Sequence, residues 1–498
     1  MSRSHVQIWG GHLEGDPNQL MVAFCAGRDV AALPMADAEL LPYDAWTNRA
    51  HAIMLHAQGI ITKETLAALL GALDSLEKDW EAGEFSLDPA LEDIHVNSEA
   101  YITRLAGADV GGRLHTGRSR NDQIACDMRL YMRDALLAMA SGTADLARTL
   151  SGLAADHLET PMPGFTHHQP AMITTWAHWL SSYVQGLCRD LERMEQTYRM
   201  VNRSPLGAAA AFGTSWPIDR EMTARLLGFE RVEHNTLDAI GSRGELEAQI
   251  AFVLTSLMNH LSVMAQDLIL LSHPYWGMVT LPDAYVTGSS IMPQKRNPDL
   301  AEVIKGKTAW LLGMTSGLLA IPKGVMSGFN RDTQWSKYSV MDVLRECLPA
   351  PSVLGGVFQG MTVHGERMRA HLNTGFPAAA DFADVLARTM GLPFRTCYNI
   401  TADAVARSGD AGIITPEAAR TALEAAGEDP SRAREALEAL ADPMAVLAWR
   451  SHTGAPAPEA VRTGLVTLGE ELARREAFIA PAREALSAAH AQCRDFRP

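Results

Sequence analysis

The sequence predicts an all-α protein built around a bundle of long helices. Three observations support this fold class. Residues that favour helices dominate the chain, alternating apolar and polar patterns typical of strands are scarce, and two segments carry apolar residues spaced alternately by three and four positions. Such seams imply long helices that pack at shallow angles, and their length indicates that several subunits share the bundle.

Three long helices are expected in the middle of the chain. The first begins near Arg120 and carries apolar residues along one face. The second carries a seam from Trp176 to Tyr198, and the third a seam from Leu254 to Leu271. The third is the most apolar run of the sequence, but four polar residues interrupt it. We therefore interpret it as a core helix and not as a membrane span.

These helices define a predicted central domain, residues 115–367, flanked by an N-terminal domain, residues 1–114, and a C-terminal domain, residues 368–498. Both flanking domains should contain shorter helices separated by breaks, one of them at the glycine-rich GADVGGR (107–113). In the C-terminal domain, Thr415 followed by Pro-Glu predicts a helix start.

Composition excludes several classes of function. The net charge of −15 and the absence of Lys/Arg clusters argue against nucleic acid as a partner. The six cysteines form no CxxC pair, which indicates reduced thiols in a cytoplasmic protein and no zinc site. No secretion signal is evident at the N-terminus. GKT (306–308) lacks the first glycine of a phosphate loop, because Ala301 stands there. We expect no metal, no cofactor and no membrane association.

A dense polar cluster precedes each of three expected helices: HTGRSRND (115–122), PGFTHHQP (163–170) and GSSIMPQKRNPD (288–299). In the last, Asn297 is expected to cap a helix that starts at Pro298. If the bundle brings these helix starts together, the clusters would line one anion-binding cleft. The alternative is that they are caps and solvated loops, since capping explains Ser, Thr and Asn at helix starts. Caps do not require the arginines, lysine and histidine of the same clusters.

The third cluster also fits a specific chemistry. Lys295 and Asn297 can bind a carboxylate that gains charge as a neighbouring carbon loses a proton. A serine beside them can act as the base only if amide donors and cations stabilise its alkoxide. A flexible GSS loop that closes over the substrate would supply that setting and exclude water.

GSSIMPQKRNPD resembles the signature loop of the fumarase/aspartase superfamily, and HTGRSRNDQ with MPQK narrows the resemblance to the argininosuccinate lyase family. Matching segments run from IWGG (8–11) to NRDTQWSK (330–337), so the resemblance covers nearly the whole chain. It implies a three-domain α fold, a homotetramer with a twenty-helix core, and active sites built from three subunits. It also implies a cofactor-free elimination that splits an N-substituted aspartate into fumarate and an amine or guanidine.

The resemblance also implies residue roles. Ser289 resembles the catalytic base that takes the Cβ proton, and Lys295 and Asn297 match the residues that hold the resulting aci-carboxylate. His167, which pairs in the family with the carboxylate at the position of Glu302, matches the residue linked to protonating the leaving nitrogen. The matching substrate-binding positions are Ser119, Arg120, Asn121 and Thr166 for the carboxylates, and Gln334 and Lys337 nearer the amine-bearing half.

Departures from the family pattern cluster where the arginine half of the substrate would bind. They are Gly27 for a serine, Phe329 for a tyrosine, Trp335 and Ser336 for an acidic pair, Met172 and Ile173 for Gln-Pro, and His12 for an arginine. A site that binds a guanidinium through hydrogen bonds discriminates poorly once those partners are gone. Three functions therefore remain open: cleavage of argininosuccinate, reversible cleavage of another N-substituted aspartate made from fumarate and an amine or diamine, and a non-catalytic structural role.

Overall fold

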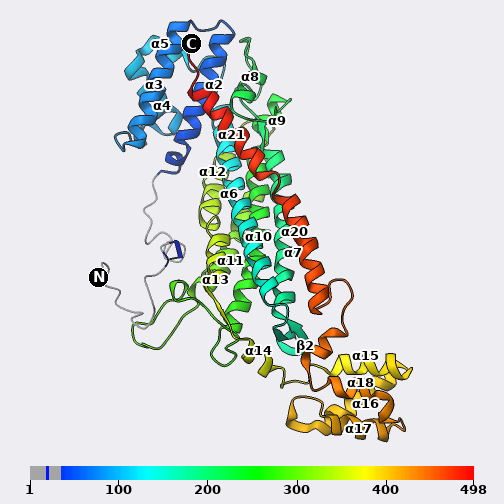
Figure 1. The fold of residues 1–498 in the computed structure, drawn as a ribbon. Coiled ribbons are helices and arrows are strands. Elements are labelled where there is room, and N and C mark those ends of the chain that lie inside the picture. The colour runs from blue at the N-terminus through cyan, green and yellow to red at the C-terminus, as the bar shows by residue number, and fades with distance from the viewer. Residues whose placement is uncertain (1–17, 19, 22–34) are drawn as a thin grey trace.

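The computed structural model describes residue 18, residues 20–21 and residues 35–498 of the chain. Long helices form an elongated bundle at its centre (Figure 1). They are α6 (Arg120–Asp156), α7 (Trp176–Val201), α10 (Glu245–Leu271), α11 (Asp299–Ala320), and α12 (Gln334–Cys347) followed by α13 (Ala350–Gly360). The predicted all-α class is confirmed for the body of the fold.

The apolar seams explain why these helices pack together. Every seam position predicted between Leu254 and Leu271 is at most 3% exposed, and α10 contacts α7, α11 and α12. This helix has the length and apolar composition of a membrane span, but 61% of its most apolar window is buried inside the fold. It is therefore the core helix that the sequence predicts. On α7, Trp176, Leu180 and Leu191 are likewise fully buried.

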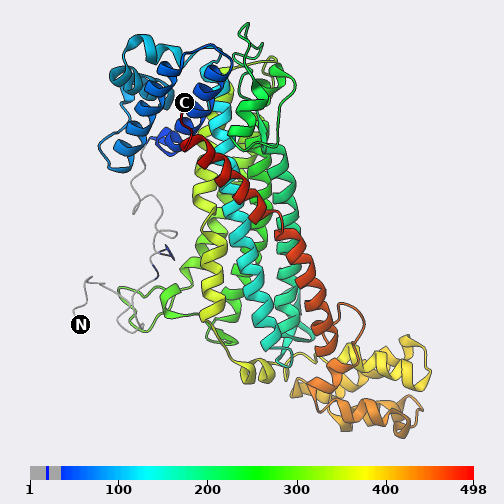
Figure 2. The same ribbon diagram turned by 45° about the horizontal axis from the view of Figure 1, so that its top comes forward.

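The direction of each helix decides which polar cluster lies at which end. Figures 1 and 2 show that α6, α10 and α12 start at the end of the bundle that carries the N-terminal helices, whereas α7 and α11 start at the opposite end. We call these the N-terminal end and the far end. The N-terminal end holds α2 (Leu41–Ala57), α3 (Lys63–Glu81), α4 (Ile94–Ala106) and α5 (Ala108–Arg113), together with α8 (Arg220–Leu226) and α9 (Thr236–Gly241). The sequence predicts a break between helices over residues 107–113. Only Gly107, which ends α4, forms such a break; the prediction is wrong for residues 108–113, because they form α5.

The described residues also contain three two-stranded sheets. The largest is an antiparallel hairpin of β1 (Pro161–Thr166) and β2 (Gln169–Thr175), with an irregularity at Gly164/Phe165. The others pair β3 (Arg203–Ser204) with β4 (Arg231–Val232) in parallel, and β5 (Val279–Thr280) with β6 (Thr362–Val363) in antiparallel orientation. The hairpin was not predicted, because prolines and a glycine lower the strand propensity of its segment.

The chain leaves the far end through α14 (Gly365–His371) and forms a small lobe with its own apolar core. The lobe contains α15 (Ala379–Met390), α16 (Phe394–Ser408), α17 (Pro416–Ala425), α18 (Arg434–Ala439) and α19 (Pro443–Ala448). Thr415 caps α17 as predicted, accepting a hydrogen bond from the Ala418 N–H at 3.2 Å. The last helices, α20 (Pro458–Glu476) and α21 (Ile479–Arg494), run back along the bundle (Figure 2). The domain limits at residues 114 and 367 stay predictions.

Candidate active site

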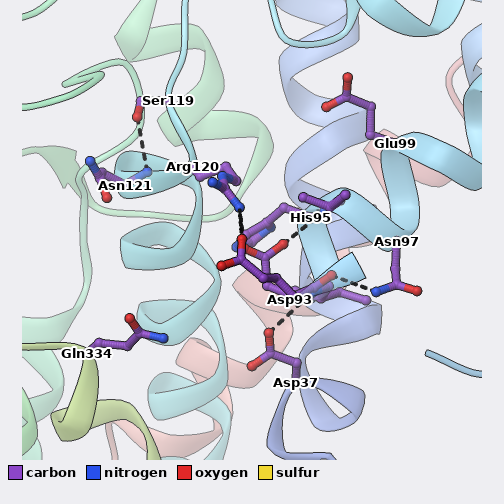
Figure 3. Close-up of polar contacts among 12 residues, drawn as sticks. Asp37, Asp93, His95, Asn97, Glu99, Ser119, Arg120, Asn121 and Gln334 are labelled. Atoms are coloured by element: carbon purple, nitrogen blue, oxygen red, sulfur yellow. Dashed lines mark hydrogen bonds and ion pairs between the residues drawn. The ribbon is translucent and has the colours of Figure 1, made fainter. Parts of the chain in front are cut away.

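A cavity of about 560 Å³ lies at the N-terminal end of the bundle, between the N-terminal helices and the starts of α6 and α12. Its lining includes five of the residues predicted to bind substrate: Ser119, Arg120, Asn121, Gln334 and Lys337. Residues more than 200 positions apart in the sequence therefore meet in one polar cavity. Figure 3 shows Ser119, Asn121 and Gln334 on one side of the view and Asp93 and His95 of the α4 region on the other, with Arg120 between them.

The start of α6 presents Ser119 and Asn121 to this cavity. Ser119 is the N-cap, and its side-chain oxygen accepts a hydrogen bond from the Asn121 N–H at 3.3 Å. Asp122 completes a capping box and also accepts hydrogen bonds from the N–H groups of Gly207 and Ala209 at 2.8 and 2.9 Å. Ser119 therefore fits both interpretations of this cluster, because it caps α6 and also lines the cavity. A helix start with free N–H groups favours a bound carboxylate.

Charged side chains in the cavity are already paired within the chain. Arg120 Nη1 lies 3.0 Å from the Asp93 carboxylate and 3.2 Å from that of Glu92 (Figure 3). Lys337, which is 5% exposed, forms an ion pair with the buried Asp37. An incoming substrate carboxylate would therefore compete with acidic residues for these cations.

The departures from the family pattern do not all reach this cavity. Phe329 lines it, and the Arg243 guanidinium lies 5.5 Å from the centre of the Phe329 ring. Trp335 is 68% exposed and packs edge-on against Tyr338. Ser336 is fully buried and donates hydrogen bonds to the Thr333 carbonyl and to Glu247.

Ile173 is also buried, in an apolar cluster at the far end. The expectation that Ser336 and Ile173 alter the arginine-binding half is therefore wrong within one chain. Gly27 and His12 lie outside the described residues.

A buried polar network lies beside the cavity, and sequence reasoning assigned no role to its members. His95 Nδ1 lies 3.0 Å from an Asp44 oxygen and 3.6 Å from an Asp127 oxygen. Thr47 donates to Asp127 at 2.6 Å, and Gln123 donates to Asp44 at 2.6 Å. The only signal was EDIH (92–95), a segment matching the family that includes this histidine.

Burial sets the charges of this network. It raises the pKa of the Asp127 carboxyl to about 8, and the neighbouring Asp44 charge adds to this effect. Burial alone would lower the pKa of His95, but the hydrogen bond and charge of Asp44 raise it above its ordinary value. One ligand atom from each of these three residues lies within 4.8 Å of the others, a spacing that a metal ion could bridge. The buried Arg118 guanidinium beside Asp44 and Asp127 disfavours a further cation there.

The predicted catalytic loop lies at the far end, just before α11. Ser289 is half-buried, and its hydroxyl oxygen accepts a hydrogen bond from the Met292 N–H at 3.1 Å. Lys295 is exposed, whereas Asn297 closes the loop by donating from its side chain to the Gly288 carbonyl at 3.0 Å. Because Asn297 is used in this way, the predicted cap is wrong by one residue: Pro298 is the N-cap and α11 starts at Asp299.

The turn of the hairpin also lies at the far end and carries Thr166 and His167. Both side chains are exposed. His167 and His168 adopt φ values of +53° and +60°, in the left-handed region that side chains with a Cβ rarely occupy. Among the described residues His167 has no hydrogen-bond or ion-pair partner, so its expected pairing with Glu302 is not formed within one chain.

The two sets of predicted residues are far apart in the chain. Helix α6 contains 37 residues and is therefore about 55 Å long at 1.5 Å per residue. Ser119 and Asn121 lie at one end of this helix, and the His167 turn and the Ser289 loop lie beyond the other (Figure 1). A single chain does not bring all three clusters together, and their convergence in a bundle shared by several subunits stays a prediction. Each chain instead carries the predicted residues in two groups, one at each end of the bundle, which we call half-sites.

Comparisons with known proteins agree with this architecture. The family described as Lyase matches residues 41–313, and the family described as Argininosuccinate lyase C-terminal matches residues 376–447. The chain is 41% identical to the argininosuccinate lyase of Thermus thermophilus, over 90% of this chain and 95% of that protein. It is 38% identical to the argininosuccinate lyase of Methanoculleus marisnigri, over 97% and 96% of the two chains.

Solved structures extend the likeness to the fold. The structure of EDDS lyase in complex with formate matches with a TM-score of 0.86 at 28% identity, over 97% of this chain and 95% of that one. A class II fumarase from Schistosoma mansoni, at 14% identity, matches with a TM-score of 0.69 over 86% and 96% of the chains and shows the shared fold alone. From the matched family and the identity to its members, the chain belongs to the argininosuccinate lyase family of the fumarase/aspartase superfamily.

Proposed function

We propose that this protein is a carbon–nitrogen lyase that eliminates fumarate from an N-substituted L-aspartate, with argininosuccinate as the first-choice substrate and arginine as the second product. The observation that carries the proposal is the cavity in which Ser119, Arg120, Asn121, Gln334 and Lys337 converge at a helix start. Relatives about 40% identical over most of the chain are argininosuccinate lyases, which supports the same substrate. Such an enzyme would act in arginine biosynthesis, and we expect it in the cytoplasm.

In the proposed reaction Ser289 is the base that removes the Cβ proton. The charge that develops spreads into the adjacent carboxylate, where Lys295 and Asn297 stabilise it. His167 and Glu302 form the proposed acid pair that protonates the leaving nitrogen. Ser119, Arg120, Asn121 and Thr166 bind the carboxylates of the substrate, and Gln334 and Lys337 contact its amine-bearing half. These groups supply the acid, the base and the charge stabilisation of this scheme without a metal or cofactor.

This reaction requires half-sites from different subunits, because the base and the carboxylate-binding cavity lie at opposite ends of one chain. We therefore propose a homotetramer whose bundles lie side by side and whose active sites are each built from three subunits, with the N-terminal end of one chain meeting the far ends of two others. Exposed apolar residues on the bundle support this arrangement: Phe252 and Val263 on α10, and Trp310, Leu312 and Leu319 on α11. A surface of this kind is expected to be covered by another subunit.

The proposal is tested by incubating the protein with argininosuccinate and following fumarate by its ultraviolet absorbance. We expect turnover by the wild type, and a loss of at least about 10³-fold in kcat for Ser289→Ala, because the reaction then lacks its base. Ser290→Ala changes the neighbouring serine and serves as the control, with near-normal turnover. Full activity of Ser289→Ala would remove this residue from the mechanism.

A second candidate is cleavage of a different N-substituted aspartate. Phe329 in the cavity offers no acceptor for a guanidinium, and a variant of EDDS lyase with bound fumarate has the same fold, with a TM-score of 0.85. Running the reaction in reverse, with fumarate and a panel of amines and diamines against arginine, separates the two candidates. Faster addition of another amine than of arginine would select the second.

A further inference from the structure

One residue of the C-terminal lobe, Arg450, binds the base of the hairpin that carries His167. Arg450 follows α19, and its Nη2 group donates a hydrogen bond to the backbone carbonyl of Ile173 on β2. Its Nε atom lies 2.9 Å from an Asp381 oxygen on α15. Asp381 is 2% exposed and the Arg450 side chain is 19% exposed. A single guanidinium therefore joins the lobe to β2, the strand that follows the turn.

This ion pair is a poor candidate for a purely stabilising contact. Burial raises the pKa of Asp381 to about 6, although the charge of Arg450 lowers it. Burial therefore destabilises the charged carboxylate more than the ion pair with Arg450 stabilises it. The second Asp381 oxygen is buried without a hydrogen-bond partner among the described residues. Buried pairs of this kind are often no more stabilising than apolar residues of the same size, which favours a role in fixing geometry.

Other contacts hold the base of the hairpin but leave its turn free. The Ile173 side chain packs against Leu372, Val446 and Leu447, and the Phe165 ring stacks on Trp276 with their centres 5.0 Å apart. Beyond these contacts, the turn projects into solvent with two successive left-handed residues, a backbone conformation that is strained for residues with a Cβ. Such a turn keeps its shape only if both strands are held firmly at the base.

We propose that Arg450, held by Asp381, is a positioning residue for the lyase reaction: it fixes β2 so that the hairpin presents His167 in a productive orientation. The proposal rests on the proposed function, which gives His167 its role as part of the acid. Arg450 contacts neither the cavity nor the Ser289 loop, so it acts through the hairpin alone. Because a displacement of about 1 Å can cost 10²-fold in rate, loosening the base of the hairpin should lower kcat. KM should change little, since most predicted carboxylate contacts lie at the opposite end of the chain.

Four variants of the full-length protein test this role. Arg450→Met removes both contacts, and Arg450→Lys keeps a charge for Asp381 but cannot hold both partners in one plane. Because Arg450→Met alone leaves a buried unpaired carboxylate, the double variant Arg450→Met/Asp381→Leu removes that charge as well, and we expect its lobe to stay folded. Arg434→Met is the matched control, since its ion pair with Glu438 lies on the exposed surface of the same lobe.

The measurements are kcat and KM for fumarate release and amide hydrogen exchange of residues 161–175. We expect the double variant to lose about 10- to 100-fold in kcat with KM changed less than about twofold, and to exchange faster in β2. Arg450→Lys should be intermediate in both measurements, and Arg434→Met should match the wild type. Wild-type kcat in the double variant, or unchanged exchange in the hairpin, would overturn the proposal. If the wild type releases no fumarate from any substrate, the proposed function fails. Faster hairpin exchange in the double variant would still show that Arg450 and Asp381 hold β2 in place.

Discussion

Lys295 illustrates how little a single chain explains about its proposed catalytic residues. Its side chain is exposed, and among the described residues it has no ion-pair partner. The ammonium group is thus available to a carboxylate supplied from outside the chain, as the proposed reaction requires. The same holds for His167, which extends from a strained turn into solvent.

Replacing Lys295 should impair the reaction without impairing the fold. We expect Lys295→Ala to lower kcat by about 10² to 10³, or about 3 kcal/mol, because one donor to the developing carboxylate charge is lost. Melting temperature should stay within about 1 °C of the wild type, since the side chain is exposed. Lys323→Ala, another exposed lysine beyond the end of α11, is the control. Near-normal kcat in Lys295→Ala would exclude Lys295 from charge stabilisation.

Asp127 should make stability depend on pH. Its carboxyl keeps a proton in the folded state up to about pH 8, whereas the unfolded chain releases that proton near pH 4. The folded state therefore binds more protons between these values, and stability falls as pH rises through this window, by up to about 1.4 kcal/mol per pH unit.

The neutral variant Asp127→Asn isolates this contribution. It mimics the protonated carboxyl, so its melting temperature should decline less than that of the wild type between pH 6 and pH 9. Asp145→Asn, an exposed position on the same helix, should keep the wild-type decline. Parallel melting profiles for Asp127→Asn and the wild type would show that Asp127 is already ionised in the folded protein.

At the scale of the element, the start of α6 depends on Asp122 more than on the residues that face the cavity. Its fully buried carboxylate accepts hydrogen bonds from the N–H groups of Ser119, Gly207 and Ala209. Asp122→Ala leaves three donors unpaired and should lower the free energy of unfolding by about 3 kcal/mol or more. Urea denaturation measures this loss, with the exposed Asp156→Ala at the other end of α6 as the control. A loss below about 1 kcal/mol would mean that water replaces the carboxylate.

The hairpin turn allows His167 to be tested without disturbing its backbone. Asparagine tolerates the left-handed conformation that His167 adopts, so His167→Asn should keep the turn. We expect kcat to fall by about 10² to 10⁴, the usual contribution of a general acid, with an unchanged melting temperature. His168→Asn, the adjacent left-handed residue, should keep most of the activity. Equal losses in the two variants would indicate damage to the turn and not the loss of an acid.

Elements with strong local patterns were predictable from the sequence, and elements defined by distant contacts were not. Spacing of apolar residues identified α7 and α10, and capping identified the start of α17. The hairpin escaped prediction because prolines mask its strands. The network of Asp44, His95 and Asp127 was not predicted, because its members come from three different helices and local periodicity does not show which helices meet.

The split of the candidate site was in principle predictable. Consecutive bundle helices run antiparallel when the chain between them stays at one end of the bundle, so the clusters that precede α6 and α7 are expected at opposite ends. The convergence of Ser119 with Gln334 across the cavity needed the structure, because no local pattern gives the register between α6 and α12.

At the scale of the whole molecule, association should be essential for activity. The double variant Leu312→Glu/Leu319→Glu places charges on the exposed apolar face of α11, a helix that contributes no residue to the lining of the cavity. We expect it to lower the molecular mass measured by analytical ultracentrifugation and to abolish fumarate release. Phe394→Glu, an equally exposed apolar residue on the C-terminal lobe, should keep both. An active monomer would contradict the shared site.

Two inactive variants should restore activity when combined, if the half-sites belong to different chains. Asn121→Ala damages the N-terminal end and Lys295→Ala the far end. Unfolding and refolding them together should form some sites from two intact halves, whereas either variant refolded alone should stay inactive. Measuring fumarate release across mixing ratios checks this, with the greatest recovery near equal amounts. No recovery at any ratio would place both halves in one chain.

The length of α6 has a genetic consequence in the proposed assembly. Since the two extremities of one polypeptide serve separate reaction centres, a mutant allele expressed beside a normal one would disable centres that healthy copies help to build. Damage confined to one extremity would spare the centres served by the other, so a harmful allele that affects one extremity should be rescued by a harmful allele that affects the other.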